Sequence, residues 1–212
     1  MRGLRTKIGR EEFDYQALMD ALSGYANPRD CVTRLLRNGT IIRIKKGLYI
    51  FGEDERREPY SRELLANLIY GPSFISLESA LSFYGLIPER VEAVMSVATG
   101  RSREFDTPAG RFVYRSARKD SFSLGVTRVE ERNASFLIAS PERALADKIR
   151  SDRRGSFSGL TMMHEYLFED LRLDESGFVG MDPDFMEQLA NALGSRKVGM
   201  CAKLLLQMRN RR

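Results

Sequence analysis

Several features that define common protein classes are scarce or missing in this chain. Its 212 residues contain two cysteines, Cys31 and Cys201, which are too few for a disulfide framework, and one histidine, His164. Clustered histidines or cysteines for a zinc site are therefore excluded. No stretch approaches the roughly 20 apolar residues that a membrane-spanning helix needs, and residues 1–13 lack the apolar run of a signal peptide. We expect a cytoplasmic protein without a membrane partner.

Sequence motifs of catalysis are also missing. There is no Gly-x-x-x-x-Gly-Lys-Ser/Thr loop, no Gly-x-Gly-x-x-Gly after a strand and no Gly-x-Ser-x-Gly elbow. His164-Glu165 is interpreted as a structural or solvent-facing pair, and Asp147-Lys148 as an exposed ion pair on a helix. The acidic residues do not form a set that a metal-dependent nuclease or nucleotidyltransferase would need. We predict that the protein is not an enzyme and uses no metal and no cofactor.

The charge and length of the chain are more informative than its motifs. A formal net charge of +5 is consistent with a polyanionic partner, although solubility alone explains such a value equally well. The length suits one large domain or two small ones. Residues 53–58 (Glu-Asp-Glu-Arg-Arg-Glu) have no apolar member, and Pro59 follows them. We therefore predict one domain over residues 1–58 and a second over residues 59–212.

Residues 27–38 have the pattern of an amphipathic helix. Asn27 is a favourable N-cap residue, and Pro28 suits the first helical position. At 100° per residue, one side of the helix is apolar and carries Cys31, Val32, Leu35 and Leu36. The opposite side is basic and polar. It carries Arg29, Asp30, Thr33, Arg34, Arg37 and Asn38.

A basic β-hairpin is predicted directly after this helix, over residues 41–51. Its turn is Lys45-Lys46-Gly47, and Arg43 adds a further cation. A helix is also predicted over residues 11–22, with Glu11, Glu12 and Asp14 near its start. It would pack behind the helix of residues 27–38. This order is typical of a winged helix-turn-helix, in which a helix enters the major groove and the hairpin contacts the backbone. The competing interpretation is a solvated surface helix followed by an ordinary turn.

The rest of the chain alternates between helical and strand patterns. Helices are expected at residues 61–70, with Ser61 as N-cap, at 77–84 and from Ser140-Pro141-Glu142 to 150. Strands are expected at 74–76, 92–99, 125–130 and 135–139, with a hairpin over 103–115. After a flexible connection at 151–159, helices follow at about 160–171, 183–193 and 197–209. The predicted fold class is α+β: an N-terminal winged helix-turn-helix, then an α+β domain with C-terminal helices.

Short runs in a particular order and spacing carry a family resemblance. In the N-terminal part they are Phe13-Asp14-Tyr15-Gln16 and the run from Ile41 to Gly52. Further along they are Ile75-Ser76-Leu77-Glu78-Ser79-Ala80-Leu81, Tyr84-Gly85-Leu86-Ile87-Pro88-Glu89, Phe105-Asp106-Thr107-Pro108, Gly110-Arg111-Phe112 and Ala139-Ser140-Pro141-Glu142-Arg143-Ala144-Leu145. With these runs the chain resembles the AbiEi-type antitoxins of type IV toxin–antitoxin systems, bacterial proteins that also regulate transcription. The resemblance extends from about residue 10 to residue 150.

The resemblance implies a DNA-binding transcriptional regulator that represses its own operon and is not an enzyme. It also implies that the second domain counteracts a nucleotidyltransferase-like toxin. The partners would be double-stranded operator DNA and that toxin, with a homodimer on DNA as an open possibility. The residues expected to contact DNA are Arg29, Thr33, Arg34, Arg37, Asn38, Arg43, Lys45 and Lys46. The alternative is a protein–protein interaction module whose winged helix is structural and binds no specific DNA.

Overall fold

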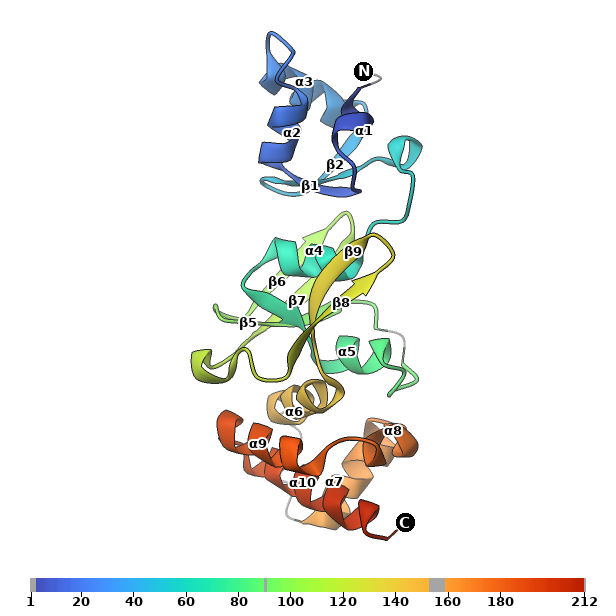
Figure 1. Cartoon of the computed structure of the whole chain (residues 1–212), viewed down its shortest axis with the longest axis vertical. Coiled ribbons are helices and arrows are strands. Elements are labelled where there is room, and N and C mark those ends of the chain that lie inside the picture. Colours follow the sequence, from blue (N-terminus) through green and yellow to red (C-terminus); the bar gives the residue numbers. More distant parts are fainter. Residues whose placement is uncertain (1–2, 90, 153–158, 212) are drawn as a thin grey trace.

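The fold is an extended stack of layers, as the computed structural model shows for residues 3–89, 91–152 and 159–211 (Figure 1). A small N-terminal unit lies at one end, a six-stranded sheet lies in the middle, and the C-terminal helices lie at the other end. Helices and strands are mixed along the chain, so the α+β class is confirmed. Most of the expected connection at 151–159 lies outside the described residues.

The N-terminal unit comprises three helices and a three-stranded antiparallel sheet. Its elements are α1 (Leu4–Lys7), β1 (Glu12–Asp14), α2 (Tyr15–Ala21), α3 (Pro28–Arg37), β2 (Ile41–Lys45) and β3 (Leu48–Phe51). The strand order is β1-β3-β2. The predicted hairpin and the helix after Asn27 are confirmed, and Gly47 takes the positive φ of +87° that the turn needs.

The predicted helix over residues 11–22 is wrong in its first part. Glu12, Phe13 and Asp14 form β1, which pairs with β3, and the helix begins only at Tyr15. The Asp14 side chain accepts a hydrogen bond from the Ala17 N–H, so it caps α2 from outside instead of lying within its first turn. Pairing with β3 satisfies the backbone of residues 12–14, and tertiary structure thereby overrides the local helical pattern.

The larger unit is built around one mixed sheet with the strand order β6-β7-β5-β4-β9-β8. Strands β4 and β9 are parallel, as are β5 and β7, whereas the remaining neighbours are antiparallel. The strands are β4 (Ser73–Ile75), β5 (Val94–Ala98), β6 (Arg103–Thr107), β7 (Gly110–Ser116), β8 (Val126–Glu131) and β9 (Ala134–Ala139). These strands correspond closely to the segments that the sequence predicts.

Helices cover this sheet on both sides. Helix α4 (Arg62–Ile69) lies between the sheet and the N-terminal unit, while α5 (Leu77–Phe83) and α6 (Pro141–Ser151) lie on the other side (Figure 1). Helices α9 (Pro183–Leu193) and α10 (Arg196–Arg209) pack against α6, and α10 also packs against α7 (Leu160–Glu165) and α8 (Glu175–Val179). A π-helical turn, Tyr166–Asp170, extends α7. Helices α1 and α8, which are both short, were not predicted.

Two hydrophobic cores lie on opposite faces of the N-terminal sheet. Tyr49 and Phe51 of β3 point into the core of the N-terminal unit, whereas Leu48 and Ile50 join the core of the larger unit. Successive strand residues point to opposite faces, so β3 is buried on both sides. The N-terminal unit therefore uses its sheet to pack onto the rest of the protein. A division into domains at residue 58 stays a prediction.

The interpretation of Asp147-Lys148 as an exposed ion pair is wrong. Asp147 is buried and pairs with Arg143, with 2.9 Å between Nε and Oδ2. Lys148 instead pairs with Glu78 of α5 at 2.6 Å. The helix turns Asp147 toward the sheet, where Arg143 neutralises it, because residues four apart lie on one helix face.

In the described part of the chain, no helix has the length and apolar character needed to cross a membrane.

Candidate nucleic-acid interface

Helix α3 buries its apolar side and exposes its basic side, as the sequence predicts. Cys31, Val32 and Leu35 are buried, and they belong to the same core as Leu18 and Ala21 of α2 and Leu22 at its C-terminal end. All five residues predicted to contact DNA from this helix are exposed: Arg29, Thr33, Arg34, Arg37 and Asn38. The core thus fixes which face of α3 is presented to solvent.

The basic face of α3 is not neutralised by the protein itself. Among the described residues, Arg29, Arg34 and Arg37 form no ion pair. The one side-chain contact of Arg34 is a weak one, from Nη2 to the Cys31 Sγ at 3.8 Å. Thr33 donates its hydroxyl to the Arg29 carbonyl at 3.3 Å. The three guanidinium groups are therefore free to donate to an external anion.

The start of α3 differs from the expectation in one detail. Asn27 occupies the N-cap position and Pro28 the first turn, but the Asn27 side chain makes no capping hydrogen bond. Asp30 lies in the first turn, where a negative charge suits the helix dipole. Arg34 and Arg37 lie in the last turn, where cations are favoured. The helix is therefore stabilised at its ends by charge and by proline more than by a side-chain cap.

The three hairpin cations do not share one environment. Arg43 is exposed, and its guanidinium lies over the Tyr49 ring at 5.9 Å from the centroid. Lys46 is exposed at the turn. Lys45 is partly buried and donates from Nζ to the backbone carbonyl of Ile69, the last residue of α4. Burial lowers the pKa of the Lys45 ammonium.

The contact made by Lys45 has a structural purpose. The last carbonyls of a helix lack intrahelical partners, and a lysine can satisfy one of them while interacting favourably with the helix dipole. Helix α4 has no capping backbone N–H at its C-terminal end, so Lys45 supplies that donor from the N-terminal unit. Of the eight predicted DNA contacts, Lys45 is the one that the structure directs toward the larger unit.

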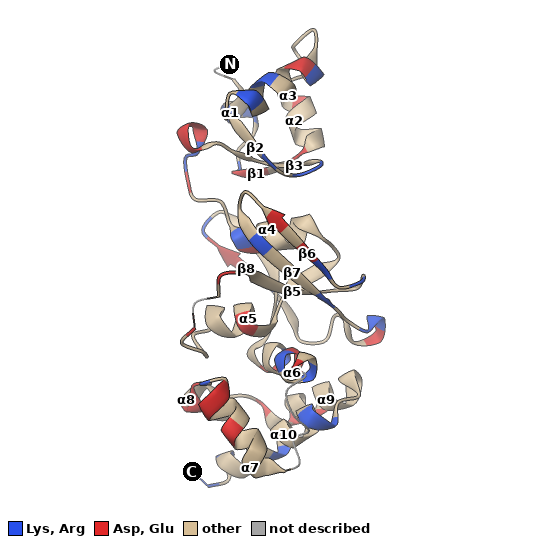
Figure 2. Ribbon diagram, turned by 180° about the vertical axis from the view of Figure 1, so that it is seen from behind, with Lys and Arg blue, Asp and Glu red and all other residues tan. Residues whose placement is uncertain are grey.

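The hairpin and α3 lie on different sides of the N-terminal unit. Figures 1 and 2 show α3 on the side away from the larger unit, and the sheet on the side that faces it. The five residues of α3 are therefore brought together on one outer surface. The hairpin cations lie nearer to the junction between the two units.

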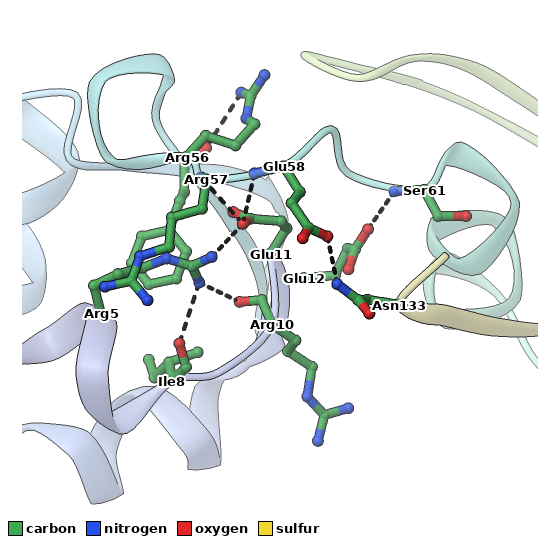
Figure 3. A network of polar contacts seen from close by, with 11 residues as sticks. Arg5, Ile8, Arg10, Glu11, Glu12, Arg56, Arg57, Glu58, Ser61 and Asn133 are labelled. Carbon is green, nitrogen blue, oxygen red and sulfur yellow. Dashed lines mark hydrogen bonds and ion pairs between the residues drawn. The ribbon is translucent and has the colours of Figure 1, made fainter. Parts of the chain in front are cut away.

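A pair of acids holds the linker that joins the units (Figure 3). The Oε1 atom of Glu11 accepts hydrogen bonds from the backbone N–H groups of Arg57 and Glu58, at 3.2 Å each. The same oxygen pairs with the Nη2 atom of Arg5, whose guanidinium lies over the Phe51 ring at 4.5 Å from the centroid. Glu11 thus fastens the linker to the core of the N-terminal unit.

The neighbouring acid reaches further along the chain. Oε1 of Glu12 accepts a hydrogen bond from the backbone N–H of Ser61, the residue that caps α4. Burial raises the pKa of Glu12. Beyond it, the Asn133 amide from the β8–β9 turn donates to the Glu58 carboxylate (Figure 3). The linker, which the sequence predicts from a run without apolar residues before Pro59, is thereby fixed by contacts from both units.

These linker contacts were not predicted. The sequence offers Glu11-Glu12 only as acids at a helix start, because nothing in the local pattern shows that β1 brings them against residues 57–61. One signal was present, namely that Leu48-Tyr49-Ile50-Phe51 lacks the alternation of a half-exposed strand. Such a continuous apolar run indicates burial on both faces, and therefore a partner on the far side of the hairpin.

Comparison with known proteins does not assign the chain to a family. Neither the scan against protein-family models nor the search of curated proteins finds a match to this chain. Within residues 3–89, 91–152 and 159–211, no group of three or more His, Cys, Asp or Glu side chains is arranged to hold a metal ion.

Proposed function

We propose that the N-terminal unit is a winged helix-turn-helix that binds double-stranded operator DNA through α3. The observation that carries this proposal is the exposed face of α3, on which Arg29, Arg34 and Arg37 have no acidic partner among the described residues. Arginine can donate two hydrogen bonds to a guanine edge in the major groove, or bind phosphate. Thr33 and Asn38 add shorter polar groups to the same face.

In this proposal, two of the three hairpin cations contact DNA. Arg43 and Lys46 are exposed and available for phosphate contacts. Lys45 instead donates to the Ile69 carbonyl and joins the two units. We therefore assign DNA contacts to Arg29, Thr33, Arg34, Arg37, Asn38, Arg43 and Lys46, and a positioning role to Lys45.

DNA binding can be tested with fluorescence anisotropy on DNA from upstream of the gene. The doubly substituted Arg34→Ala/Arg37→Ala protein should bind at least about tenfold more weakly than wild type, because a base contact contributes about 1–3 kcal/mol. Arg128→Ala/Arg196→Ala is the matched control. It removes the same charge from exposed sites on β8 and α10 and should bind like wild type. Equal affinity of all three proteins would refute the assignment to α3.

The dependence on salt separates phosphate contacts from base contacts. Removing one lysine or arginine that binds a phosphate should reduce the slope of log K against log salt by about 0.9. Arg43→Ala and Lys46→Ala should therefore weaken binding to operator and unrelated DNA alike. The Arg34→Ala/Arg37→Ala protein should show a weaker preference for the operator. A substitution in the hairpin that changes only specificity would contradict its role in binding phosphate.

We further propose that the protein acts as the antitoxin of a type IV toxin–antitoxin system and represses its own operon. The resemblance to AbiEi-type antitoxins supports this, and the toxin would be a nucleotidyltransferase-like protein. Co-expression with the product of an adjacent gene of that kind tests it. Growth should be restored by the full chain and also by the Arg34→Ala/Arg37→Ala protein, because in this proposal α3 binds DNA and not the toxin. Growth arrest that the full chain leaves unchanged would refute the antitoxin function.

One observation favours a second candidate, a protein–protein interaction module with a structural winged helix. Strand β3 of the hairpin is buried on both faces, and Lys45 of the hairpin supports α4, so these parts of the hairpin make their contacts within the protein. In that case the basic face of α3 would bind an acidic protein surface. Capture of such a partner, together with no DNA binding at low salt, would favour this function over the first.

A further inference from the structure

A cavity lies far from α3, on the face of the central sheet that points away from α4. Its volume is about 710 Å³, and its lining includes Leu77, Glu78, Met95, Val97, Arg115 and Arg150. We call it the sheet cavity. Small-molecule sites typically have volumes of about 300–1,000 Å³. A second hollow of about 450 Å³ shares Met95 and Arg115 with it, so the cavity continues along the same strands.

The register of the sheet explains which side chains reach the cavity. Val97 of β5 is paired with Arg115 of β7, and Ser96 with Tyr114. Paired residues point to the same face of a sheet and successive residues to opposite faces. The Tyr114 hydroxyl donates to the Ala66 carbonyl of α4 at 2.7 Å, so Ser96 and Tyr114 face α4. Val97 and Arg115 therefore face the cavity, with Val97 as part of an apolar floor.

The wall opposite this floor is polar, but its charges are mostly paired. Lys148 pairs with Glu78 at 2.6 Å and with Asp152 at 3.3 Å, and Asp147 pairs with Arg143 at 2.9 Å. Their long side chains are held in place by one another and give the wall a fixed shape.

Two cations of the cavity are not paired. Arg115 of β7 and Arg150 of α6 are exposed, and their guanidinium groups form no ion pair or hydrogen bond among the described residues. A hydroxyl, that of Ser102, lines the same cavity. Ser102 accepts the Ser116 N–H at 3.1 Å, so its own O–H remains free to donate. Two guanidinium groups and a hydroxyl form a set of donors suited to an oxyanion.

Backbone strain at the wall is an independent indication of a site. Leu77, the first residue of α5, has a φ of +54°. Left-handed backbone is a genuine outlier for a bulky residue, and such strain concentrates at ligand-binding and catalytic positions. Leu77 lines the sheet cavity next to Glu78. The strained turn therefore coincides with the cavity that has unpaired arginines.

We propose that the sheet cavity binds a small phosphorylated molecule whose phosphate group is held by Arg115 and Arg150. The two arginines come from different elements, so they approach from different directions. A phosphate group offers three terminal oxygens and about two negative charges, whereas a carboxylate offers two oxygens in one plane. The apolar floor of Met95 and Val97, with Leu77 of the wall, then receives the uncharged part of the ligand. This site does not depend on DNA binding by α3.

Pyrophosphate is the probe that tests the proposal, with citrate at equal ionic strength as the carboxylate arm. Thermal denaturation and titration calorimetry are carried out on wild type, Arg115→Gln, Arg150→Gln and Arg128→Gln. The last removes the same charge from β8, at the opposite edge of the sheet from β6 and β7. Because Arg115 and Arg150 are exposed and without ion pairs among the described residues, both variants should fold with an unchanged Tm when no ligand is present.

Pyrophosphate should raise the Tm of wild type and Arg128→Gln, since a ligand that binds only the folded state stabilises it. Its Kd should be at least about tenfold weaker in Arg115→Gln and in Arg150→Gln, because each substitution removes a charge-assisted hydrogen bond. No Tm shift in wild type, or an equal shift in all four proteins, would overturn the proposal. Binding of citrate but not pyrophosphate would do so too. If wild type does not bind pyrophosphate and Arg115→Gln binds DNA more weakly than wild type, the proposal is also overturned, and Arg115 instead contacts the DNA backbone.

Discussion

Among the described residues, Arg143 has the largest side chain that is completely buried. Its ion pair therefore offers the sharpest test of how the larger unit is stabilised. Its Nε donates to Oδ2 of Asp147 at 2.9 Å, and its Nη1 donates to the carbonyls of Ser121 and Leu124, at 2.6 Å each. Ser76 donates its hydroxyl to the same Asp147 oxygen at 2.9 Å. One buried ion pair thus connects α6 to Ser76, which precedes α5, and to the connection between β7 and β8.

Asp147→Ala removes the acceptor of the hydrogen bonds from Arg143 Nε and from the Ser76 hydroxyl. It leaves the charge of Arg143 buried without a negative partner. Breaking a buried pair from one side costs about 3–5 kcal/mol. Asp147→Asn should cost less, because it keeps an acceptor oxygen but removes the charge. The Arg143→Met/Asp147→Leu protein should recover much of the lost stability, since apolar residues of similar volume often replace buried pairs without penalty.

Urea denaturation followed by far-ultraviolet circular dichroism measures these changes, since the chain contains no tryptophan for fluorescence. At an m-value of about 2–3 kcal/mol/M, Asp147→Ala should lower the midpoint by about 1–2 M. Glu104→Ala is the control, because its ion pair with Arg111 is exposed and should contribute little. A loss below about 1 kcal/mol for Asp147→Ala, or equal losses for Asp147→Ala and Glu104→Ala, would refute the reasoning.

Three further predictions concern the junction between the units. Glu11→Ala leaves three donors unpaired, so trypsin should cleave within residues 53–58 at least about tenfold faster than in wild type, and an unchanged cleavage rate would contradict this. Burial raises the pKa of Glu12 in the folded protein above its ordinary 4.5. The folded state therefore binds this proton more tightly than the unfolded state, and its contribution to the free energy of unfolding is complete below pH 4.5 and is lost as pH rises. Glu12→Gln should therefore be more stable than wild type at pH 7 but not at pH 4, as urea midpoints would show. In Gly52→Ala the new Cβ would lie 1.8 Å from a backbone oxygen, which should cost about 1–3 kcal/mol, whereas Gly24→Ala, with open space around it, should melt like wild type.

Much of the architecture is predictable from local patterns. The amphipathic order of residues 28–38, the Lys-Lys-Gly turn and the capping residues Ser61 and Ser140 all lie where short-range physics places them. Each of these features is decided within a few residues by helix periodicity, backbone freedom or one side-chain hydrogen bond. The α+β class and most helix and strand positions follow from them.

The errors arise where distant segments meet. Residues 12–14 form a strand only because β3 lies beside them, and Asp147 is buried only because Arg143 and Ser76 surround it. The exposed face of α3 was correctly predicted because amphipathicity alone orients a helix on a core. The sheet cavity was not predicted, since Arg115 and Arg150 are brought to it by different elements of the larger unit.

The sequence by itself determined the basic face of α3, the hairpin after it and the mixed α and β character of the chain. These depend on periodicity and turn chemistry, which act over short distances. Only the tertiary structure decided that strand β3 is buried on both faces and that Lys45 supports α4. It also decided that Glu11 and Glu12 hold the linker and that two arginines share a cavity. Those outcomes depend on which surfaces far apart in the chain pack together, and no local pattern encodes that choice.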